Sequence, residues 1–133
     1  MSWRLSPRQL RLYRDRVTIH RERESLAADG QPTPSGHEIV AADVPCYIQM
    51  ADSVKGPVDF VVDEQDNLFT YDQVHFPDGV PVRSGDVLEV TAGSQAGEFY
   101  TARGDAKRRN LHANKLMVRC NRALARPAWV PGP

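Results

Sequence analysis

The sequence predicts an all-β protein, a small β-barrel or sandwich of six to seven short strands. Apolar and polar residues alternate in short runs, as in residues 16–21, which is typical of a half-buried strand. Glycine and proline turns separate these runs at intervals of roughly 8–15 residues, as expected for small barrels and sandwiches. The chain of 133 residues has the length of one domain with one modest core.

The stretch 68–90 organises this prediction. Aromatic and branched side chains between Phe69 and Phe76 favour a strand. Pro77-Asp78-Gly79 then predicts a turn, because proline fixes φ and glycine adopts positive φ without steric cost. A second turn at 84–86 leads into another strand at 87–90. Two apolar strands with a short connection predict one corner of a barrel or sandwich.

The residues before this stretch divide into strands and loops. Residues 1–14 are expected to form one or two helical turns, with Ser6 as N-cap and Pro7 at the first helical position. A loop is predicted at 25–37, which holds two prolines, two glycines and no periodicity. A long hairpin loop or insertion is predicted at 51–67. Strands are predicted at 16–21 and 44–50, the second with an extension at 39–40.

The residues after it complete the sheet. Strands are predicted at 98–101 and 116–120, with a basic loop at 103–110 between them. Residues 125–133 contain three prolines, which excludes a helix or a central strand and predicts an extended tail. The expected organisation is an N-terminal arm (1–13), a barrel domain (14–122, including the long loop) and a C-terminal tail (123–133).

The charges are segregated along the chain, although the formal net charge is zero. Residues 1–23 carry +5 and residues 103–126 carry +7, whereas residues 24–102 carry −12. One interpretation is that the basic segments pack beside the acidic middle, in the same subunit or in a neighbour. The other is that the surface has two faces of opposite sign, which steer assembly or repel a polyanion.

No motif in the sequence indicates catalysis, a metal site or a cofactor. The four histidines have no metal-ligand spacing, and no nucleophile elbow or phosphate-binding loop occurs. Cys46 and Cys120 are too few for a disulfide framework and are expected to be buried thiols. No apolar run approaches the ~20 residues of a membrane span, and the basic N-terminus lacks the apolar core of a secretory signal. We therefore predict a protein that is not an enzyme and does not bind a membrane.

The terminal segments hold the candidates for subunit contacts. Trp3 and Trp129 lie where the core does not need them, and an exposed tryptophan is a solubility liability unless something covers it. Each tail either folds back on its own domain or reaches an adjacent subunit, where Trp and Arg are favoured anchors. The full set of subunit-interface candidates is Trp3, Arg8, Arg11, Arg108, Arg109 and Trp129.

The order of four short motifs and a closing strand resembles that of a known family. R-V-T-I-H-R begins at Arg16, V-P-C-Y-I-Q at Val44, V-H-F-P-D-G at Val74 and S-G-D-V-L-E-V at Ser84, with a closing strand near Val118. Together they resemble the small head–tail connector proteins of tailed bacteriophages, also called head-closure, stopper or head–tail joining proteins. The resemblance covers about residues 14–122 and does not extend to either terminal segment.

This resemblance implies a structural role in the virion. Such proteins are β-barrel subunits that form a ring in the phage neck, between the portal or adaptor of the DNA-filled head and the tail or tail-terminator protein. They help to retain DNA, which passes through the channel without sequence-specific binding. The chain is then made in the host bacterial cytoplasm and resides in the virion neck. A loop of each subunit can enter the channel, and the candidate residues on loop 51–67 are Asp52, Lys55, Asp59, Asp63, Glu64 and Asp66.

The alternative function is a nucleic-acid-binding barrel of the SH3-like or oligonucleotide-binding (OB) type. The basic residues of 103–109 and the arginines of the first 23 residues would contact phosphates. Phe99 and Tyr100, just before them, would stack on bases. The segment leading through S-G-D-V-L-E-V into a glycine-containing turn is also similar to the opening of such barrels. Core packing explains both aromatic residues equally well.

Overall fold

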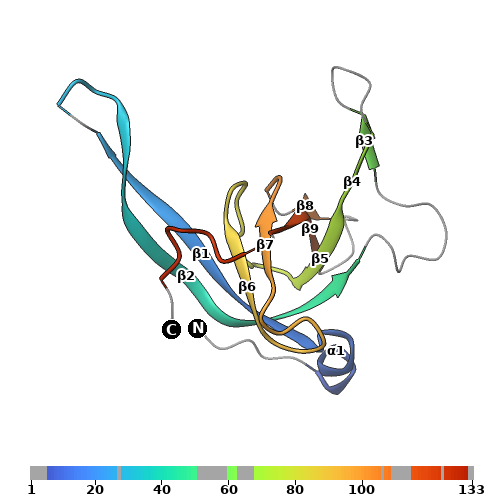
Figure 1. The fold of residues 1–133 in the computed structure, drawn as a ribbon. Coiled ribbons are helices and arrows are strands. Elements are labelled where there is room, and N and C mark those ends of the chain that lie inside the picture. The colour runs from blue at the N-terminus through green and yellow to red at the C-terminus, as the bar shows by residue number, and fades with distance from the viewer. Residues whose placement is uncertain are drawn as a thin grey trace.

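A six-stranded antiparallel barrel forms the body of the molecule (Figure 1). The computed structural model describes residues 6–26, 28–50, 60–62, 68–105, 107–108, 115–123 and 125–131. The barrel strands follow one another in the order β1-β2-β5-β9-β7-β6, and β6 pairs with β1 to close the ring. The predicted all-β barrel with a short N-terminal helix is therefore confirmed. The elements in chain order are α1 (Pro7–Leu12), β1 (Asp15–Leu26), β2 (Pro32–Gln49), β3 (Phe60–Val62), β4 (Leu68–Thr70), β5 (Asp72–Pro77), β6 (Val87–Ala92), β7 (Phe99–Ala102), β8 (Lys107–Arg108) and β9 (Lys115–Ala123).

The side chains predicted to face the core fill the barrel. The alternating strands place Val17 and Ile19 of β1 inside, and both are fully buried. Strands β2 and β9 each turn one face to the same interior. The core therefore follows from the period-2 pattern of the sequence. Its buried members are Val17, Ile19, Val44, Cys46, Ile48, Val74, Phe76, Val80, Val82, Leu88, Val90, Tyr100, Ala102, Leu116, Val118 and Cys120.

Helix α1 begins where its sequence predicts, with Ser6 as N-cap and Pro7 at the first helical position. The Ser6 hydroxyl accepts a hydrogen bond from the Gln9 backbone N–H, and the Gln9 side chain accepts one from the Ser6 N–H. This reciprocal capping box satisfies two donors that a helix start leaves unpaired. Tyr13 caps the other end and is buried, and its hydroxyl donates to the Phe76 carbonyl at 3.4 Å. Burial raises the pKa of Tyr13. One aromatic side chain thus fixes the helix to the barrel.

Strands β1 and β2 are longer than predicted. Their pairing continues from Asp15 opposite Cys46 to Leu26 opposite Pro32, so the prediction of a loop at 25–37 is wrong for all but the turn. Two of the prolines in β2 lie in this outer part, at 32 and 34. Proline lacks the N–H of a central ladder and is confined to edge strands. This part of β2 is an edge, because among the described residues it pairs with β1 alone.

A β-bulge interrupts β2 a few residues after its outer part. Val17 lies opposite Val44, but the next pair is Ile19 with Ala41, so β2 holds an extra residue. Asp43 within this bulge has a φ of 50°, a left-handed conformation that Asp and Asn tolerate better than most residues. The Thr91 hydroxyl donates to the Asp43 carboxylate at 3.2 Å. Because bulges bend a strand and increase its twist, we expect this one to bend β2 between its barrel segment and its outer part.

Strands β3, β4 and β8 lie on the side of the barrel away from the outer part of β1 and β2 (Figure 1). Strands β3 and β4 form a separate two-stranded pair, and β8 adds to the edge of β9 within the region predicted as a basic loop.

The β6–β7 turn brings Gly93 so close to Asp15 that a Cβ there would lie 2.0 Å from the Asp15 Oδ1, and the φ of Gly93 is +110°. Only glycine fits this position.

Candidate functional site: the projecting arm and its base

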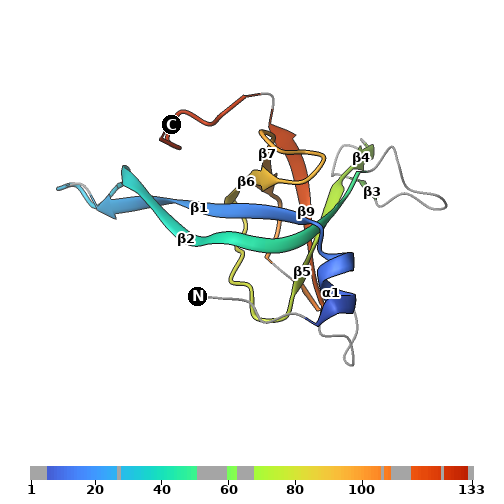
Figure 2. The same cartoon turned by 90° about the horizontal axis from the view of Figure 1, so that it is seen from below.

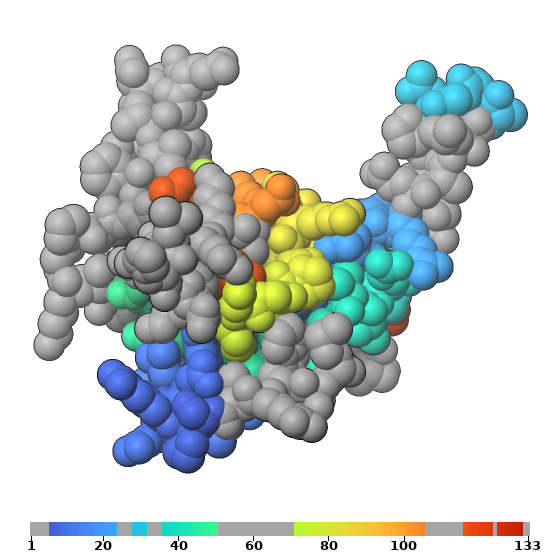
Figure 3. Space-filling view, turned by 180° about the vertical axis from the view of Figure 1, so that it is seen from behind, coloured from blue at the N-terminus to red at the C-terminus, as the bar shows by residue number. Residues whose placement is uncertain are grey.

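The most distinctive feature of the molecule is a two-stranded arm that extends beyond the barrel. We define the arm as residues 21–26 of β1 with residues 28–38, which comprise the turn and the first part of β2. In Figure 1 and Figure 2 this hairpin extends well past the barrel strands, and in the space-filling view of Figure 3 its tip stands clear of the body. Within the described part of the chain, the β1 residues of the arm pair only with β2, because the ladder to β6 ends at His20.

An ion pair fixes one face of the arm's base. The Arg21 guanidinium donates from Nε to Asp86 Oδ1 at 2.9 Å and from Nη2 to Asp86 Oδ2 at 2.8 Å. The same Nη2 donates to the Pro81 carbonyl at 3.0 Å. The Asp86 side chain is only 3% exposed and also accepts the Arg83 backbone N–H at 2.9 Å. The hydrogen bond to Asp86 raises the pKa of Arg21. Two-point charge-assisted contacts of this kind are both strong and directional.

A chain of three polar side chains fixes the other face. His20 is 4% exposed, and its Nε2 lies 2.9 Å from Glu89 Oε1 on β6. Its Nδ1 lies 3.2 Å from His37 Nε2 on β2. When both rings are neutral, His20 donates to Glu89, so its Nδ1 accepts from His37. The two rings also stack, with centroids 5.3 Å apart. Three strands are thereby connected at the point where the arm leaves the barrel.

The C-terminal tail covers this second face. Arg126 lies over the Phe99 ring at 4.8 Å from its centroid, and its Nη2 is 3.6 Å from Glu89 Oε2. Trp129 is half-buried and packs with a small apolar cluster of Val87, Phe99 and Val130. The Trp129 ring also lies 6.5 Å from the His37 ring, centroid to centroid. The tail thus folds back on its own barrel and reaches the base of the arm.

The predicted interface residues are placed as follows. Arg8 and Arg11 are exposed on α1, whereas Trp129 packs on its own chain. Arg108 lies on β8, and its side chain is not described. Trp3 and Arg109 lie outside the described residues, as do all six channel-loop candidates, Asp52, Lys55, Asp59, Asp63, Glu64 and Asp66. The structure thus brings Arg8 and Arg11 together on α1, whereas Trp129 packs against Val87 and Phe99.

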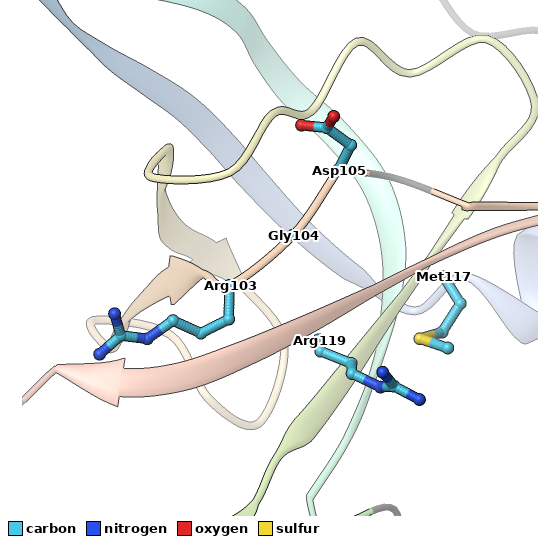
Figure 4. A pocket seen from close by; sticks show the side chains of 5 residues that line it. All are labelled: Arg103, Gly104, Asp105, Met117 and Arg119. Carbon is cyan, nitrogen blue, oxygen red and sulfur yellow. The ribbon is translucent and has the colours of Figure 1, made fainter. Parts of the chain in front are cut away.

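The basic turn after β7 borders only a small pocket. The pocket has a volume of about 80 Å³. Its lining residues, drawn in Figure 4, are Arg103, Gly104, Asp105, Met117 and Arg119. Pockets that bind small molecules usually enclose ~300–1,000 Å³. In Figure 4 the side chains of Arg103 and Arg119 extend in different directions from opposite sides of the pocket. This arrangement does not form a convergent anion site.

The described residues offer two free thiols and no cluster of metal ligands. Among them, no group of three His, Cys, Asp or Glu side chains converges closely enough to hold a metal ion. Cys46 and Cys120 are buried free thiols, and burial raises the pKa of both far above the usual range. Such thiols are poor nucleophiles, because only the thiolate reacts. In the same part of the chain, no helix has the length and apolar character needed to cross a bilayer.

Sequence reasoning missed the base of the arm. The sequence pattern places Arg21 in a strand and Asp86 in a turn, and 65 positions separate them. The one available signal was Asp86 itself, because an acidic residue directly before an apolar strand run needs a partner once the strand is buried.

Comparisons with family models, with curated proteins and with solved structures found no significant match to this chain.

Proposed function

We propose that this chain is a structural subunit of a ring in the neck of a tailed bacteriophage. The ring joins the portal or adaptor of the DNA-filled head to the tail or tail-terminator protein and helps to retain the DNA. Two features support this proposal. The order of the sequence motifs resembles that of the head–tail connector proteins, and the barrel carries an arm suited to subunit contacts. The proposed role needs no catalysis and no cofactor.

The arm is the observation that carries the proposal. An isolated two-stranded hairpin is marginally stable at best in water, and exposed strand edges tend to pair with other chains. The arm has both properties within the described part of the chain, yet ion pairs and hydrogen bonds fix both faces of its base. A rigidly mounted arm of this kind is typical of a subunit that completes its packing in an assembly. The neighbouring subunits of a ring supply that packing.

The segregated charges fit the same assembly. The basic N-terminal segment includes the exposed Arg8 and Arg11 of α1, whereas the middle of the chain is strongly acidic. Complementary charges across subunits speed and orient association, and rising salt screens them. An acidic loop 51–67 would suit a channel through which DNA slides without sticking. The candidate residues of that loop lie outside the described residues.

The nucleic-acid-binding alternative has less support. Stacking on bases needs exposed aromatic faces, but Phe99 is 7% exposed and Tyr100 is fully buried. The Phe99 ring is already covered by the Arg126 guanidinium and by the tail. A barrel that binds single strands would also need a continuous basic groove, whereas Arg103 and Arg119 diverge in Figure 4. The ring subunit is therefore the function that the geometry supports best.

The test compares the full chain with a variant whose arm is shortened. Because Arg23 lies opposite Gly36, a two-residue Asn-Gly turn can replace residues 24–35. The replacement leaves the barrel core and the ion pairs at the base in place. We expect native mass spectrometry and negative-stain electron microscopy to show closed rings of the full chain and folded monomers of the variant. Rings formed equally well by both would contradict this role of the arm, and monomers of both would contradict the proposed ring.

A further inference from the structure

The end of the molecule that carries α1 has an uncovered surface. Within the described part of the chain, α1 buries none of its residues. Leu10 is 49% exposed and Leu12 is 38% exposed, and Arg8 and Arg11 lie exposed on the same short helix. Exposed leucines beside arginines have the composition of an interface patch. A helix of six residues is not stable on its own, so a partner on this surface would stabilise it.

The arm and this helix lie at opposite ends of one strand. Helix α1 ends at Leu12, β1 begins at Asp15, and β1 ends at Leu26 next to the tip of the arm. Twelve strand residues span on the order of 40 Å. Figure 1 and Figure 2 show α1 and the tip at the two ends of the molecule. The arm of a chain therefore cannot cover the helix of the same chain.

The two surfaces carry opposite charges. Residues 6–14 contain three arginines and no acidic residue, whereas residues 21–38 contain four acidic residues and two arginines. Both arginines of the arm are already paired, Arg21 with Asp86 and Arg23 with Glu38. At the tip, Asp29 is exposed, and its carboxylate accepts only the backbone N–H of Gln31 among the described residues. The acidic excess of the arm is thus available to a basic partner.

We infer that the arm of one subunit docks on the α1 surface of the next copy of the same chain. The contact is heterologous, because two different surfaces meet, and repeating it by rotation generates a closed ring. The acidic tip faces Arg8 and Arg11, and the arm covers Leu10 and Leu12. This inference rests on the proposed ring and specifies which surfaces form it.

Charge reversal on each surface tests the contact. Arg11→Glu changes the helix and Asp29→Lys changes the arm tip, and each places like charges across the proposed contact. We expect each variant alone to associate at least about tenfold more weakly than the wild type, because like-charge contacts are strongly unfavourable at an interface. Arg103→Glu is the matched control, since it changes the net charge as much as Arg11→Glu does, at an exposed turn elsewhere. Asp29→Asn keeps an acceptor for the Gln31 N–H and isolates the effect of charge.

Mixing the two reversed variants gives the sharpest readout. In the mixture, the basic arm tip of the Asp29→Lys variant meets the acidic helix of the Arg11→Glu variant. The unchanged arm of the Arg11→Glu variant likewise meets the unchanged helix of the Asp29→Lys variant. Analytical ultracentrifugation and electron microscopy should therefore show alternating rings from the mixture, although neither variant forms them alone. The double variant Arg11→Glu/Asp29→Lys should assemble by itself. Ring formation by the mixture would also show that the Arg11→Glu and Asp29→Lys variants are both folded.

Several results would overturn the docking of arm on helix. The first is that the single variants assemble like the wild type. The second is that mixing them does not restore assembly, and the third is that the wild type does not associate at all. Failure of the charge exchange together with loss of rings in the shortened-arm variant would leave the ring in place and reject only these contact surfaces. Labelling of phage particles tests the neck role independently of either result.

Discussion

Arg21 and Asp86 join the projecting arm to the barrel through two parallel hydrogen bonds of 2.9 and 2.8 Å. Arg21 is the first residue of the arm, immediately after the last strand residue paired with β6. Asp86 ends the turn before β6, and its carboxylate is almost completely buried. The pair therefore fixes the direction in which the arm leaves the barrel. Any role of the arm in assembly depends on this contact.

Removing one member of this pair should destabilise the fold. Arg21→Ala leaves the Asp86 carboxylate buried without its cation, and breaking buried pairs costs ~3–5 kcal/mol. Because the Arg21 side chain is 23% exposed, we expect a loss of about 2–3 kcal/mol in the free energy of unfolding. Urea denaturation measures it. Arg83→Ala is the control, because Arg83 donates to Asp86 through its backbone N–H, which the substitution keeps. Equal stability of the two variants would mean that the pair does not fix the arm.

The tail should contribute to stability through Trp129. The Trp129 side chain packs against the small apolar cluster that contains Val87 and Phe99. Removing it would expose part of that cluster to water. Trp129→Ala should lower the free energy of unfolding by about 1–3 kcal/mol, less than a fully buried tryptophan because Trp129 is half-buried. Ala128→Ser, at an exposed neighbour, should stay within about 0.5 kcal/mol of the wild type. If Trp129→Ala also leaves the free energy of unfolding unchanged, the Trp129 contact does not hold the tail on the barrel in solution.

The two buried thiols predict a fall in stability at alkaline pH. Burial raises the pKa of Cys46 and Cys120 in the folded chain, whereas unfolded thiols ionise near ~8.5. Above that pH only the unfolded chain releases these protons, so unfolding becomes more favourable as pH rises. The slope approaches about 1.4 kcal/mol per pH unit for each thiol.

Denaturation series at several pH values between 8 and 9.5 measure this slope. The variant Cys46→Ala/Cys120→Ala should be less stable at pH 8 but should lose most of the slope. Burial also raises the pKa of Tyr100 to about 12, so this tyrosine adds its own alkaline destabilisation once the unfolded side chain ionises near ~10. Keeping the series below pH 10 limits that contribution. A slope that is the same in the variant would assign the alkaline effect to other groups.

Tyr100 offers a prediction of the opposite sign. Its ring fills the barrel core, but its buried hydroxyl has no hydrogen-bond partner among the described residues. A buried polar group without a partner is unfavourable, so its removal is neutral or stabilising. Tyr100→Phe should therefore match the wild type or exceed it by up to about 1 kcal/mol in thermal or urea denaturation. A loss above about 1 kcal/mol would indicate that the hydroxyl has a partner outside the described residues.

The strands and the core could be predicted from the sequence, because local alternation determines which residues face the interior. Val17, Ile19 and Val118 show this directly, since each lies in a predicted strand and is fully buried. The arm could not be predicted in the same way. Prolines and glycines at 25–37 indicate a loop by composition, and they are tolerated in a strand only because this part of β2 is an edge.

The contacts at the base of the arm could not be predicted from the sequence either. His20 meets Glu89 across 69 positions, and Arg21 meets Asp86 across 65. Both contacts follow from the pairing of β1 with β6, which no local pattern specifies. The tail is a similar case. The sequence left open whether Trp129 folds back or reaches a neighbour, and only the three-dimensional arrangement shows it beside Val87 and Phe99.

The most direct test of the central claim is antibody-gold labelling of phage particles from the source lysate, viewed by negative-stain electron microscopy. We predict label at the neck, between head and tail, on intact particles. Heads without tails should carry it at the portal vertex. The absence of label from intact and tailless particles alike would contradict a role in the neck, whatever rings the purified chain forms.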